Sequence, residues 1–218
     1  MPTRKRHSYF NTAPWIKICG LTDPETAKAC AGLGADAVGL VFFEKSPRNL
    51  TMAQAAAISS ALPPSVLPIG VFVNKGFKYI METVKQCGLK GVQLHGSESP
   101  GLVKHLVDEN LMVAKALFSG KAPLLTAAAA YSQATYLLVE CGRGILPGGN
   151  AETWDYRQSA TLCGAYPVIL AGGLHPGNVA EAVRTVLPAA VDVSSGVEKA
   201  PGVKDIGKIK AFIQAVRP

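Results

Sequence analysis

Eight short apolar runs recur along the chain, and their regular spacing restricts the possible folds more than any other feature. The starts of successive runs lie 21 to 32 residues apart. Each run is nearly continuous in apolar residues instead of alternating with polar ones, which is typical of parallel strands covered on both faces. We expect strands at Trp15–Cys19, Ala37–Phe42, Leu67–Val73, Gly91–Leu94, Met112–Leu117, Thr135–Glu140, Pro167–Ala171 and Ala190–Ser194.

Helical patterns fill the gaps between these runs. The segment Thr22–Glu25 combines a capping residue, an early proline and a glutamate three positions after the threonine, which indicates a helix start. That helix is expected to stop at Gly32 or Gly34. Further helices are expected near residues 51–61, 77–87, 99–108, 122–130, 156–163, 177–187 and 205–216.

Strands that alternate with helices predict an α/β fold with a parallel sheet. Eight strands close a barrel, and 218 residues lies near the lower end of the usual range for one. We therefore predict a single (β/α)8 TIM barrel over residues 15–218, preceded by a flexible basic tail at residues 1–14. A doubly wound open sheet is the alternative, but no GxGxxG motif follows the first strand.

Composition excludes several other classes of protein. The chain is 48% hydrophobic, too apolar for a disordered protein, and no apolar run approaches the roughly 18 residues of a membrane span. Its five cysteines are odd in number and form no CxxC pair, so neither a disulfide framework nor a zinc site is indicated. No secretory signal follows the basic start. We expect a cytoplasmic protein that binds no membrane and no metal.

The net charge of +7 is concentrated at the N-terminus. The first 14 residues hold Arg4, Lys5 and Arg6 and no acidic residue, which leaves +4 for the rest of the chain. Aromatic residues make up only 7%, and no basic stripe alternates with them as in single-strand binders. A small anionic substrate therefore explains the charge better than nucleic acid, which we expect not to bind.

Polar and glycine residues gather where the expected strands end, whereas the strand starts are bland. In a barrel these ends meet at one face, where active sites lie. Two late strands end in Gly172-Gly173 and in Ser194-Ser195-Gly196. Glycine lets backbone N–H groups approach an anion, and the loops after strands 7 and 8 form the common phosphate site of barrels. We predict that these five residues bind phosphate.

Four side chains near these strand ends are candidates for chemistry. Cys19 is either a thiolate nucleophile or general base, or a small buried hydrophobic residue. Glu140 is either a general acid that faces Cys19 across the barrel or a rim residue that reaches solvent. Arg48 is either a bidentate clamp for a carboxylate or a solvated loop cation. His95 is either a hydrogen-bond donor to substrate or a satisfied core histidine.

Together these residues resemble the phosphoribosylanthranilate isomerase family, and the resemblance covers residues 15–217. Seven segments in the same order are far more specific than any one of them. They are Lys17–Thr22, Gly34–Gly39 leading to Ser46–Arg48, Gly70–Asn74, Val92–Gly96, Pro147–Asn150, Leu170–Leu174 and Val191–Glu198.

This resemblance implies an Amadori rearrangement in tryptophan biosynthesis, without metal or organic cofactor. N-(5'-phosphoribosyl)anthranilate would open its ring and isomerise to 1-(2-carboxyphenylamino)-1-deoxyribulose 5-phosphate. The family base matches Cys19, and the family arginine that holds the anthranilate carboxylate matches Arg48. His95 and Asp192 match further polar positions that line the site. The implied phosphate site comprises Gly148, Gly149 and Asn150 with Gly172, Gly173, Ser194, Ser195 and Gly196. A monomer or a homodimer is expected.

The chain departs from the family at the acid. The family has an aspartate at the end of strand 6, where alignment on Pro147–Asn150 places Glu140, with Val139 and Cys141 as the alternatives. Glutamate keeps the carboxylic acid but adds a methylene, and a misplacement of about 1 Å can cost about a hundredfold in rate. The alternative hypothesis is therefore a phosphosugar-binding barrel with weakened or altered catalysis.

Overall fold

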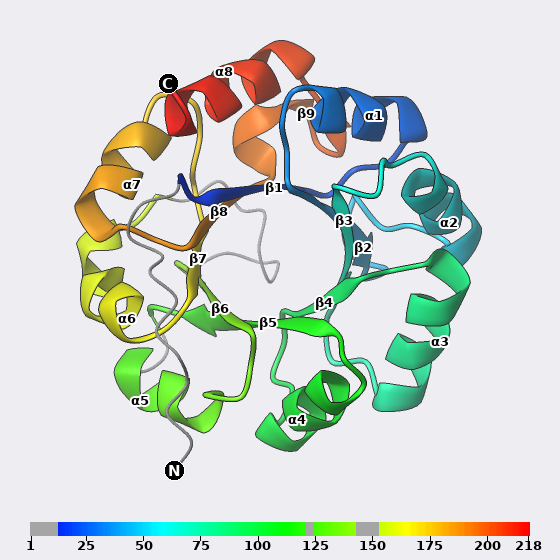
Figure 1. Ribbon diagram of the computed structural model, residues 1–218, viewed down its shortest axis with the longest axis horizontal. Helices are drawn as coiled ribbons and strands as arrows, with labels where there is room; N and C mark the ends of the chain where they lie inside the picture. Colours follow the sequence, from blue (N-terminus) through cyan, green and yellow to red (C-terminus); the bar gives the residue numbers. More distant parts are fainter. Residues whose placement is uncertain (1–12, 121–123, 143–152) are drawn as a thin grey trace.

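The strands form a closed parallel barrel, as predicted (Figure 1). The computed structural model describes residues 13–120, 124–142 and 153–218. Each strand pairs in parallel with the next, and the eighth pairs with the first through Lys17 and Asp192 among others. The strands are β1 Trp15–Cys19, β2 Ala37–Phe42, β3 Leu67–Phe72, β4 Gly91–Leu94, β5 Met112–Phe118, β6 Tyr136–Glu140, β7 Val168–Leu170 and β8 Ala190–Val193.

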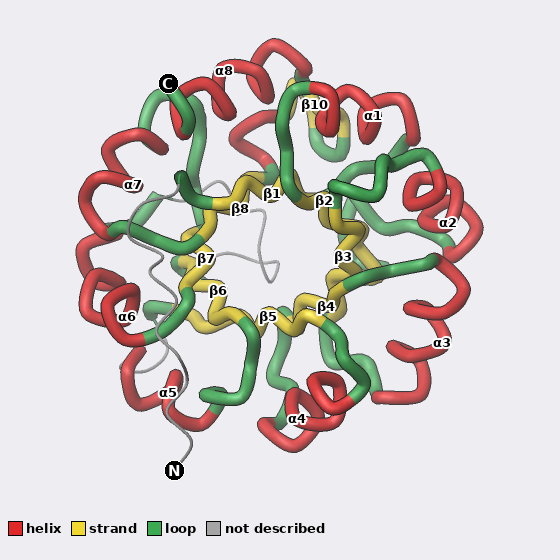
Figure 2. The backbone as a smooth tube through the Cα atoms, viewed as in Figure 1, coloured by secondary structure: helices red, strands yellow, loops and turns green. Residues whose placement is uncertain are grey.

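A ring of helices surrounds the strands (Figures 1 and 2). Each of the first seven barrel strands is followed along the chain by a helix that returns to the start of the next strand, which is the connection that parallel strands require, and α8 follows the last strand. The helices are α1 Pro24–Gly32, α2 Met52–Ser60, α3 Phe77–Cys87, α4 Pro100–Asp108, α5 Leu124–Ala130, α6 Ala160–Ala165, α7 Val179–Val186 and α8 Ile206–Val216. The architecture is thus a (β/α)8 TIM barrel.

The start of α1 differs from the expected capping arrangement. Asp23, and not Thr22, caps the helix, because its carboxylate accepts a hydrogen bond from the Thr26 amide. The Thr22 hydroxyl instead donates to the Gly202 carbonyl oxygen, 180 residues further along the chain. Thr22 therefore ties the first strand–helix loop to residue 202, in the connection between β8 and α8.

Two segments differ from the sequence prediction in kind. The helix expected near 156–163 is a 3-10 helix at Tyr156–Ser159 followed by α6. After β8 and a 3-10 turn at Ser195–Val197, a small antiparallel pair was not expected: β9 Glu198–Ala200 and β10 Val203–Lys204. These short polar strands lie beside the carboxyl end of the barrel and carry two residues of the candidate site.

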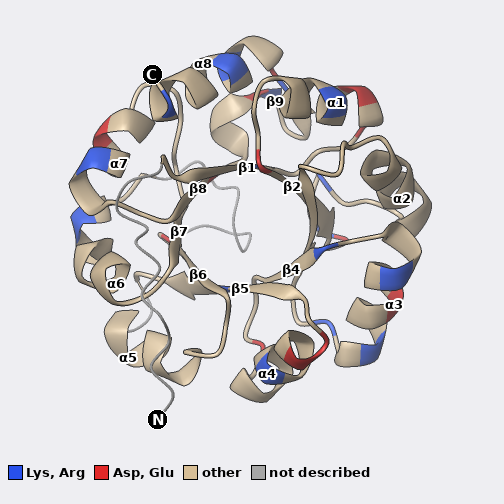
Figure 3. Cartoon of the chain, viewed as in Figure 1, with Lys and Arg blue, Asp and Glu red and all other residues tan. Residues whose placement is uncertain are grey.

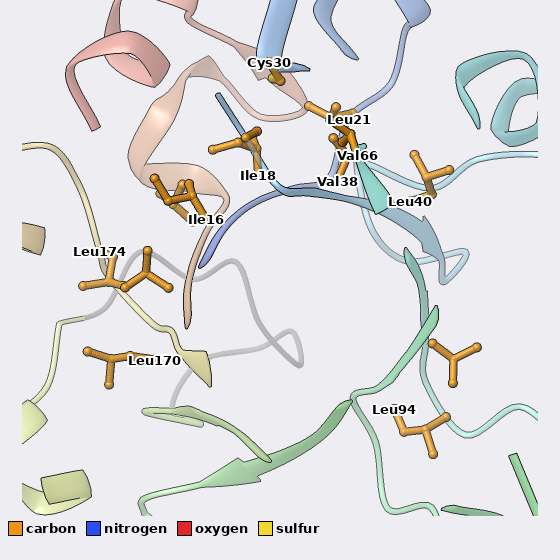
Figure 4. Close-up of a cluster of buried hydrophobic side chains, with 14 of the residues drawn as sticks. Ile16, Ile18, Leu21, Cys30, Val38, Leu40, Val66, Leu94, Leu170 and Leu174 are labelled. Carbon is orange, nitrogen blue, oxygen red and sulfur yellow. The ribbon is translucent and has the colours of Figure 1, made fainter. Parts of the chain in front are cut away.

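The core has two layers, one outside and one inside the strands. Outward side chains such as Ile16, Ile18 and Leu170 pack under the helices, and Figure 4 shows them arranged around the ring of strands. Small residues including Ala114 and Ala171 fill part of the barrel interior. Because side chains alternate along a strand, the residues between the outward ones face inward. The interior is therefore where the polar strand residues meet.

Within the described part of the chain, no helix is long and apolar enough to cross a membrane. The predicted phosphate-binding residues Gly148, Gly149 and Asn150 fall within residues 143–152, which lie outside the described residues. The basic residues of the expected tail, Arg4 to Arg6, also lie outside them.

Candidate active site

The barrel strands carry only four charged residues, although charge is common on the surrounding helices (Figure 3). The four are Lys17, Lys115, Glu140 and Asp192, and all are buried, with 2 to 8% of their surface exposed. Burying a charge is unfavourable unless the group is paired or hydrogen-bonded. The partners of these residues therefore indicate what the barrel interior is built to do.

Cys19 ends β1 on the inward face, in contact with Val41 and Val71. Burial raises the pKa of its thiol, and the nearby ammonium of Lys17 opposes that rise. Lys17 in turn pairs with Asp192 on the adjacent strand β8, with 2.9 Å between Nζ and Oδ1. Asp192, expected to line the substrate site, thus holds a lysine beside the candidate base.

Arg48 is buried, so the alternative of a solvated loop cation is wrong. Its Nε and Nη2 each lie 2.7 Å from a carboxylate oxygen of Glu198 on β9. Lys204 on β10 donates to the same carboxylate at 2.7 Å. Burial alone would raise the pKa of Glu198, but the Arg48 and Lys204 contacts outweigh it and hold that pKa below its usual range.

The position of Arg48 depends on a glycine at the end of β1. Gly20 has a φ of 78°, and a Cβ added there would lie 2.3 Å from Arg48 Cδ. The arginine stem therefore crosses directly over the residue that follows Cys19. A guanidinium has five N–H donors. Since Glu198 takes two of them along one edge, the others remain outside this pair.

Glu140 ends β6 and is 6% exposed, so it is not a rim residue that reaches solvent. Leu138, two residues earlier, belongs to the inner layer, which places Glu140 on the same inward face. Its Oε1 lies 3.1 Å from His95 Nε2. Val139, one of the alternatives for the position of the family's acid, packs in the outer layer and does not face the barrel interior.

His95 lies between a glutamine and Glu140. Its Nδ1 is 2.8 Å from Gln93 Nε2, and an amide nitrogen that donates to Nδ1 leaves the imidazole proton on Nε2, toward Glu140. Within the described residues, neither His95 Nε2 nor Gln93 Oε1 has a hydrogen bond of good geometry. One of the two predictions for His95, a core histidine with all its hydrogen bonds made, is therefore wrong.

The structure brings the two predicted phosphate loops into contact. A Cβ added at Gly196, after β8, would lie 1.9 Å from the carbonyl oxygen of Leu174, after β7. Gly172 and Gly173 have positive φ values of 82° and 67°. Their carbonyl oxygens accept hydrogen bonds from the Tyr156 hydroxyl and the Asn178 amide, at 2.9 and 3.0 Å, which hold the loop from one side.

The loop after β8 is also held by Lys204, which contacts Glu198 in the Arg48–Glu198 pair. Lys204 Nζ donates to the carbonyl oxygen of Ser194 at 3.1 Å and lies 3.3 Å from its hydroxyl. Ser195 begins the 3-10 turn. One lysine therefore links the predicted phosphate loop to the Arg48–Glu198 pair.

Four residues of this arrangement were given no role by the sequence: Lys17, Gln93, Glu198 and Lys204. A signal existed for the first two, because Lys17 and Gln93 lie two residues before Cys19 and His95 and so share their strand faces. No local pattern connects Glu198 to Arg48, which is 150 residues away. Among the described residues, no group of three or more His, Cys, Asp and Glu side chains could hold a metal ion.

A (β/α)8 barrel with a buried thiol, a buried carboxyl and two touching glycine loops at one end has the organisation of a barrel enzyme that acts on a phosphorylated substrate. The family model described as N-(5'phosphoribosyl)anthranilate (PRA) isomerase matches residues 16–215. The chain therefore belongs to this family of enzymes.

Relatives and solved structures agree with this family. The N-(5'-phosphoribosyl)anthranilate isomerase of Desulfatibacillum aliphaticivorans is 49% identical over 199 residues, which is 91% of each chain. A crystal structure of the Thermotoga maritima phosphoribosyl anthranilate isomerase is 37% identical, has a TM-score of 0.87, and matches 94% of this chain and 98% of its own. A second similar structure, with a TM-score of 0.83 and 36% identity, covers the same shares and is a complex with reduced 1-(o-carboxyphenylamino)-1-deoxyribulose 5-phosphate.

Proposed function

We propose that this chain catalyses the Amadori rearrangement of N-(5'-phosphoribosyl)anthranilate to 1-(2-carboxyphenylamino)-1-deoxyribulose 5-phosphate, a step of tryptophan biosynthesis. The observation that carries the proposal is the placement of Cys19 and Glu140. Both are buried, inward-facing residues at the carboxyl ends of two strands of one barrel, with β7 and β8 between them on one side. A base and an acid on different walls of one barrel suit a reaction that moves two protons on one substrate.

The first step opens the ribose ring. Glu140, as the carboxylic acid, gives its proton to the furanose oxygen while the C1'–O bond breaks and the anthranilate nitrogen, which keeps its hydrogen, forms a protonated imine with C1'. His95 Nε2 lies 3.1 Å from Glu140 Oε1, so both side chains face the same part of the barrel. Position matters here, because a general acid must lie within hydrogen-bond reach of the atom that it protonates.

The second step moves hydrogen along the sugar. The Cys19 thiolate removes the proton from C2', the electron pair of that C–H bond forms the C1'–C2' double bond, and the imine electrons return to nitrogen. The resulting enolamine takes a proton at C1', releases the proton of its C2' hydroxyl and becomes the ketone. Cys19 finishes this step as a neutral thiol and must lose its proton again before the next turnover.

The charged and glycine-rich groups would hold the two ends of the substrate. Arg48, beside Cys19, retains guanidinium donors beyond those given to Glu198, and these suit the anthranilate carboxylate. The touching loops at Gly172–Gly173 and Ser194–Gly196 suit the phosphate, because backbone N–H groups in such turns favour an anion. The same site therefore accounts for a substrate with a phosphate and a carboxylate.

The proposal is tested by turnover. Purified protein mixed with freshly prepared N-(5'-phosphoribosyl)anthranilate should remove the substrate fluorescence and yield a product of unchanged mass. Saturable binding of a reduced product analogue without any turnover would instead support the alternative, a phosphosugar-binding barrel in which Glu140 no longer serves as the acid. If the protein shows neither turnover nor binding, the proposed function and its alternative are both refuted.

A further inference from the structure

Lys17 is a buried lysine inside the barrel, and the reaction steps above give it no task. It is 3% exposed and lies on the inward face of β1. Its ammonium pairs with Asp192 Oδ1 at 2.9 Å, in register across the β1–β8 pairing. A buried ion pair of this kind is weak support for stability, because desolvation offsets most of its attraction. Its position therefore calls for a functional explanation.

Lys17 and Cys19 converge on one small space. They are two residues apart on β1 and so share a face of the strand. The register partner of Cys19 on β2 is Gly39. A Cβ added to Gly39 would lie 2.6 Å from Cys19 Sγ and 2.9 Å from Lys17 Nζ. The missing side chain of Gly39 thus makes room for the thiol and the ammonium to meet.

The charges around Cys19 oppose one another. Burial disfavours the thiolate most strongly and raises the pKa of Cys19. Lys17 gives the largest opposing contribution, through its charge and a hydrogen bond, whereas Asp192 on β8 disfavours the thiolate. Lys204 on β10 favours the thiolate, and Arg48, in the loop after β2, also interacts with it. Lys17 is the cation that borders the same space at Gly39 as the thiol and is also paired with a carboxylate of its own.

We propose that Lys17 is a positioning residue for Cys19: held by Asp192, its ammonium hydrogen-bonds the Cys19 sulfur and stabilises the thiolate. When the thiolate takes the C2' proton, the sulfur becomes neutral and the Lys17 ammonium keeps Asp192 as its counter-ion. The inference deepens the proposed function, on which only its kinetic consequence rests. The effect of Lys17 on the ionisation of Cys19 belongs to the resting protein and does not depend on turnover.

The test follows the ionisation of Cys19 in Lys17→Met. Thiolate absorbance near 240 nm is recorded against pH, and the curve of the matching protein with Cys19→Ser is subtracted to isolate this one cysteine. Loss of an adjacent opposite charge shifts the pKa of an ionisable group by about 1 to 3 units. We therefore expect the Cys19 transition to move to higher pH by that amount. The acidic limb of kcat/KM should move with it.

Two further variants separate this role from a general loss of structure. Lys17→Met leaves Asp192 buried and unpaired, so Lys17→Met/Asp192→Asn removes both charges and should still shift Cys19 upward, by less. Lys115→Met is the matched control: Lys115 is also a buried strand lysine paired with a carboxylate, Glu98 at 3.0 Å, but it lies in the β4–β5 region.

The outcomes are distinct. An unchanged Cys19 transition in both Lys17 variants, or an equal shift in Lys115→Met, overturns the inference. A shifted transition confined to the Lys17 variants supports it. If that shift occurs in a protein that does not turn over the substrate, the proposed function fails and the inference about the thiolate stands.

Discussion

Cys19 and Glu140 lie on different walls of the same barrel, in surroundings of different chemistry. We call the residues around the thiol the thiol side: Lys17, Cys19, Arg48, Asp192, Glu198 and Lys204. The carboxyl side comprises Gln93, His95 and Glu140. The thiol side is a network of ion pairs, whereas the carboxyl side contains one carboxyl group, an imidazole and an amide, and leaves two polar atoms without a well-formed hydrogen bond.

The difference between the two surroundings fits the protonation states that Cys19 and Glu140 need for the reaction. A base must be an anion when it removes a proton, and the fixed cations beside the sulfur oppose the rise in the Cys19 pKa that burial causes. An acid must exchange a proton with substrate, so rigid ion pairs around it would oppose its task. His95 Nε2 and Glu140 Oε1, 3.1 Å apart without good hydrogen-bond geometry, leave directions in which substrate oxygen can complete the bonds.

The largest effect on turnover from the carboxyl side is expected when Glu140 is replaced by a residue that cannot donate an acidic proton. We expect Glu140→Gln to lower kcat by about 10²- to 10⁴-fold, the range for removal of a general acid. KM should change little, because the amide keeps the size of the side chain. Steady-state assays of substrate fluorescence measure both constants.

Glu140→Asp tests the geometry of the same residue. The shorter side chain is the family's acid, so activity at or above that of the unchanged protein would mean that the extra methylene places the carboxyl imperfectly. A loss of about a hundredfold would mean that β6 is adjusted to glutamate. Full activity in Glu140→Gln would remove Glu140 from the mechanism.

Removal of the Glu198 charge on the thiol side should lower the free energy of unfolding. Glu198→Gln leaves the buried cations Arg48 and Lys204 facing each other, and breaking a buried pair of this kind costs about 3 kcal/mol. Because the pKa of Glu198 is held below its usual range, its carboxylate stabilises the fold above the unfolded-state pKa of about 4.3 and loses that effect as pH falls through the folded-state value.

Urea unfolding at pH 7 and below pH 4 measures this effect. The stability difference between the unchanged protein and Glu198→Gln should be large at pH 7 and shrink at the acidic end. A difference that is the same at both pH values would show that size or packing, and not charge, explains the role of Glu198. Lys208→Gln is a suitable control, since Lys208 contacts the Glu198 carbonyl and not its carboxylate.

The smallest effect is expected for Gln93→Leu. The amide fixes which nitrogen of His95 carries the proton, so its loss should lower kcat/KM by about tenfold or less, and nitrogen NMR of the imidazole should report a mixed tautomer. Stability should hold or rise, because the variant removes a buried carbonyl oxygen without a partner in the described residues. An unchanged tautomer would contradict this assignment.

Much of the fold could be predicted from local sequence. The bounds of β1, β2, β4 and α3 agree with the expected ranges, because continuous apolar runs and an amphipathic stretch between glycines leave few alternatives. β7 is shorter than expected and spans only Val168–Leu170. The β9–β10 pair was missed because five mostly polar residues in two short strands produce no apolar run.

The site was predictable only where strand ends mark it. Cys19, His95 and Glu140 could be found because each ends or directly follows an apolar run, and parallel strand ends meet at one face. The Arg48–Glu198 pair could not, since its partners are 150 residues apart and meet only through the closed barrel. Lys17 shares the strand face of Cys19, but no local pattern shows that it pairs with Asp192, which is 175 residues away.

The central claim is that Cys19 is the base, and the most direct test is kcat/KM of Cys19→Ala with N-(5'-phosphoribosyl)anthranilate. Cys163→Ala is the control, because Cys163 is a half-buried cysteine in α6. We predict a loss of at least about 10²-fold in Cys19→Ala, with a folded protein that still binds the reduced product analogue, and activity close to normal in Cys163→Ala. Full activity in Cys19→Ala would contradict the account.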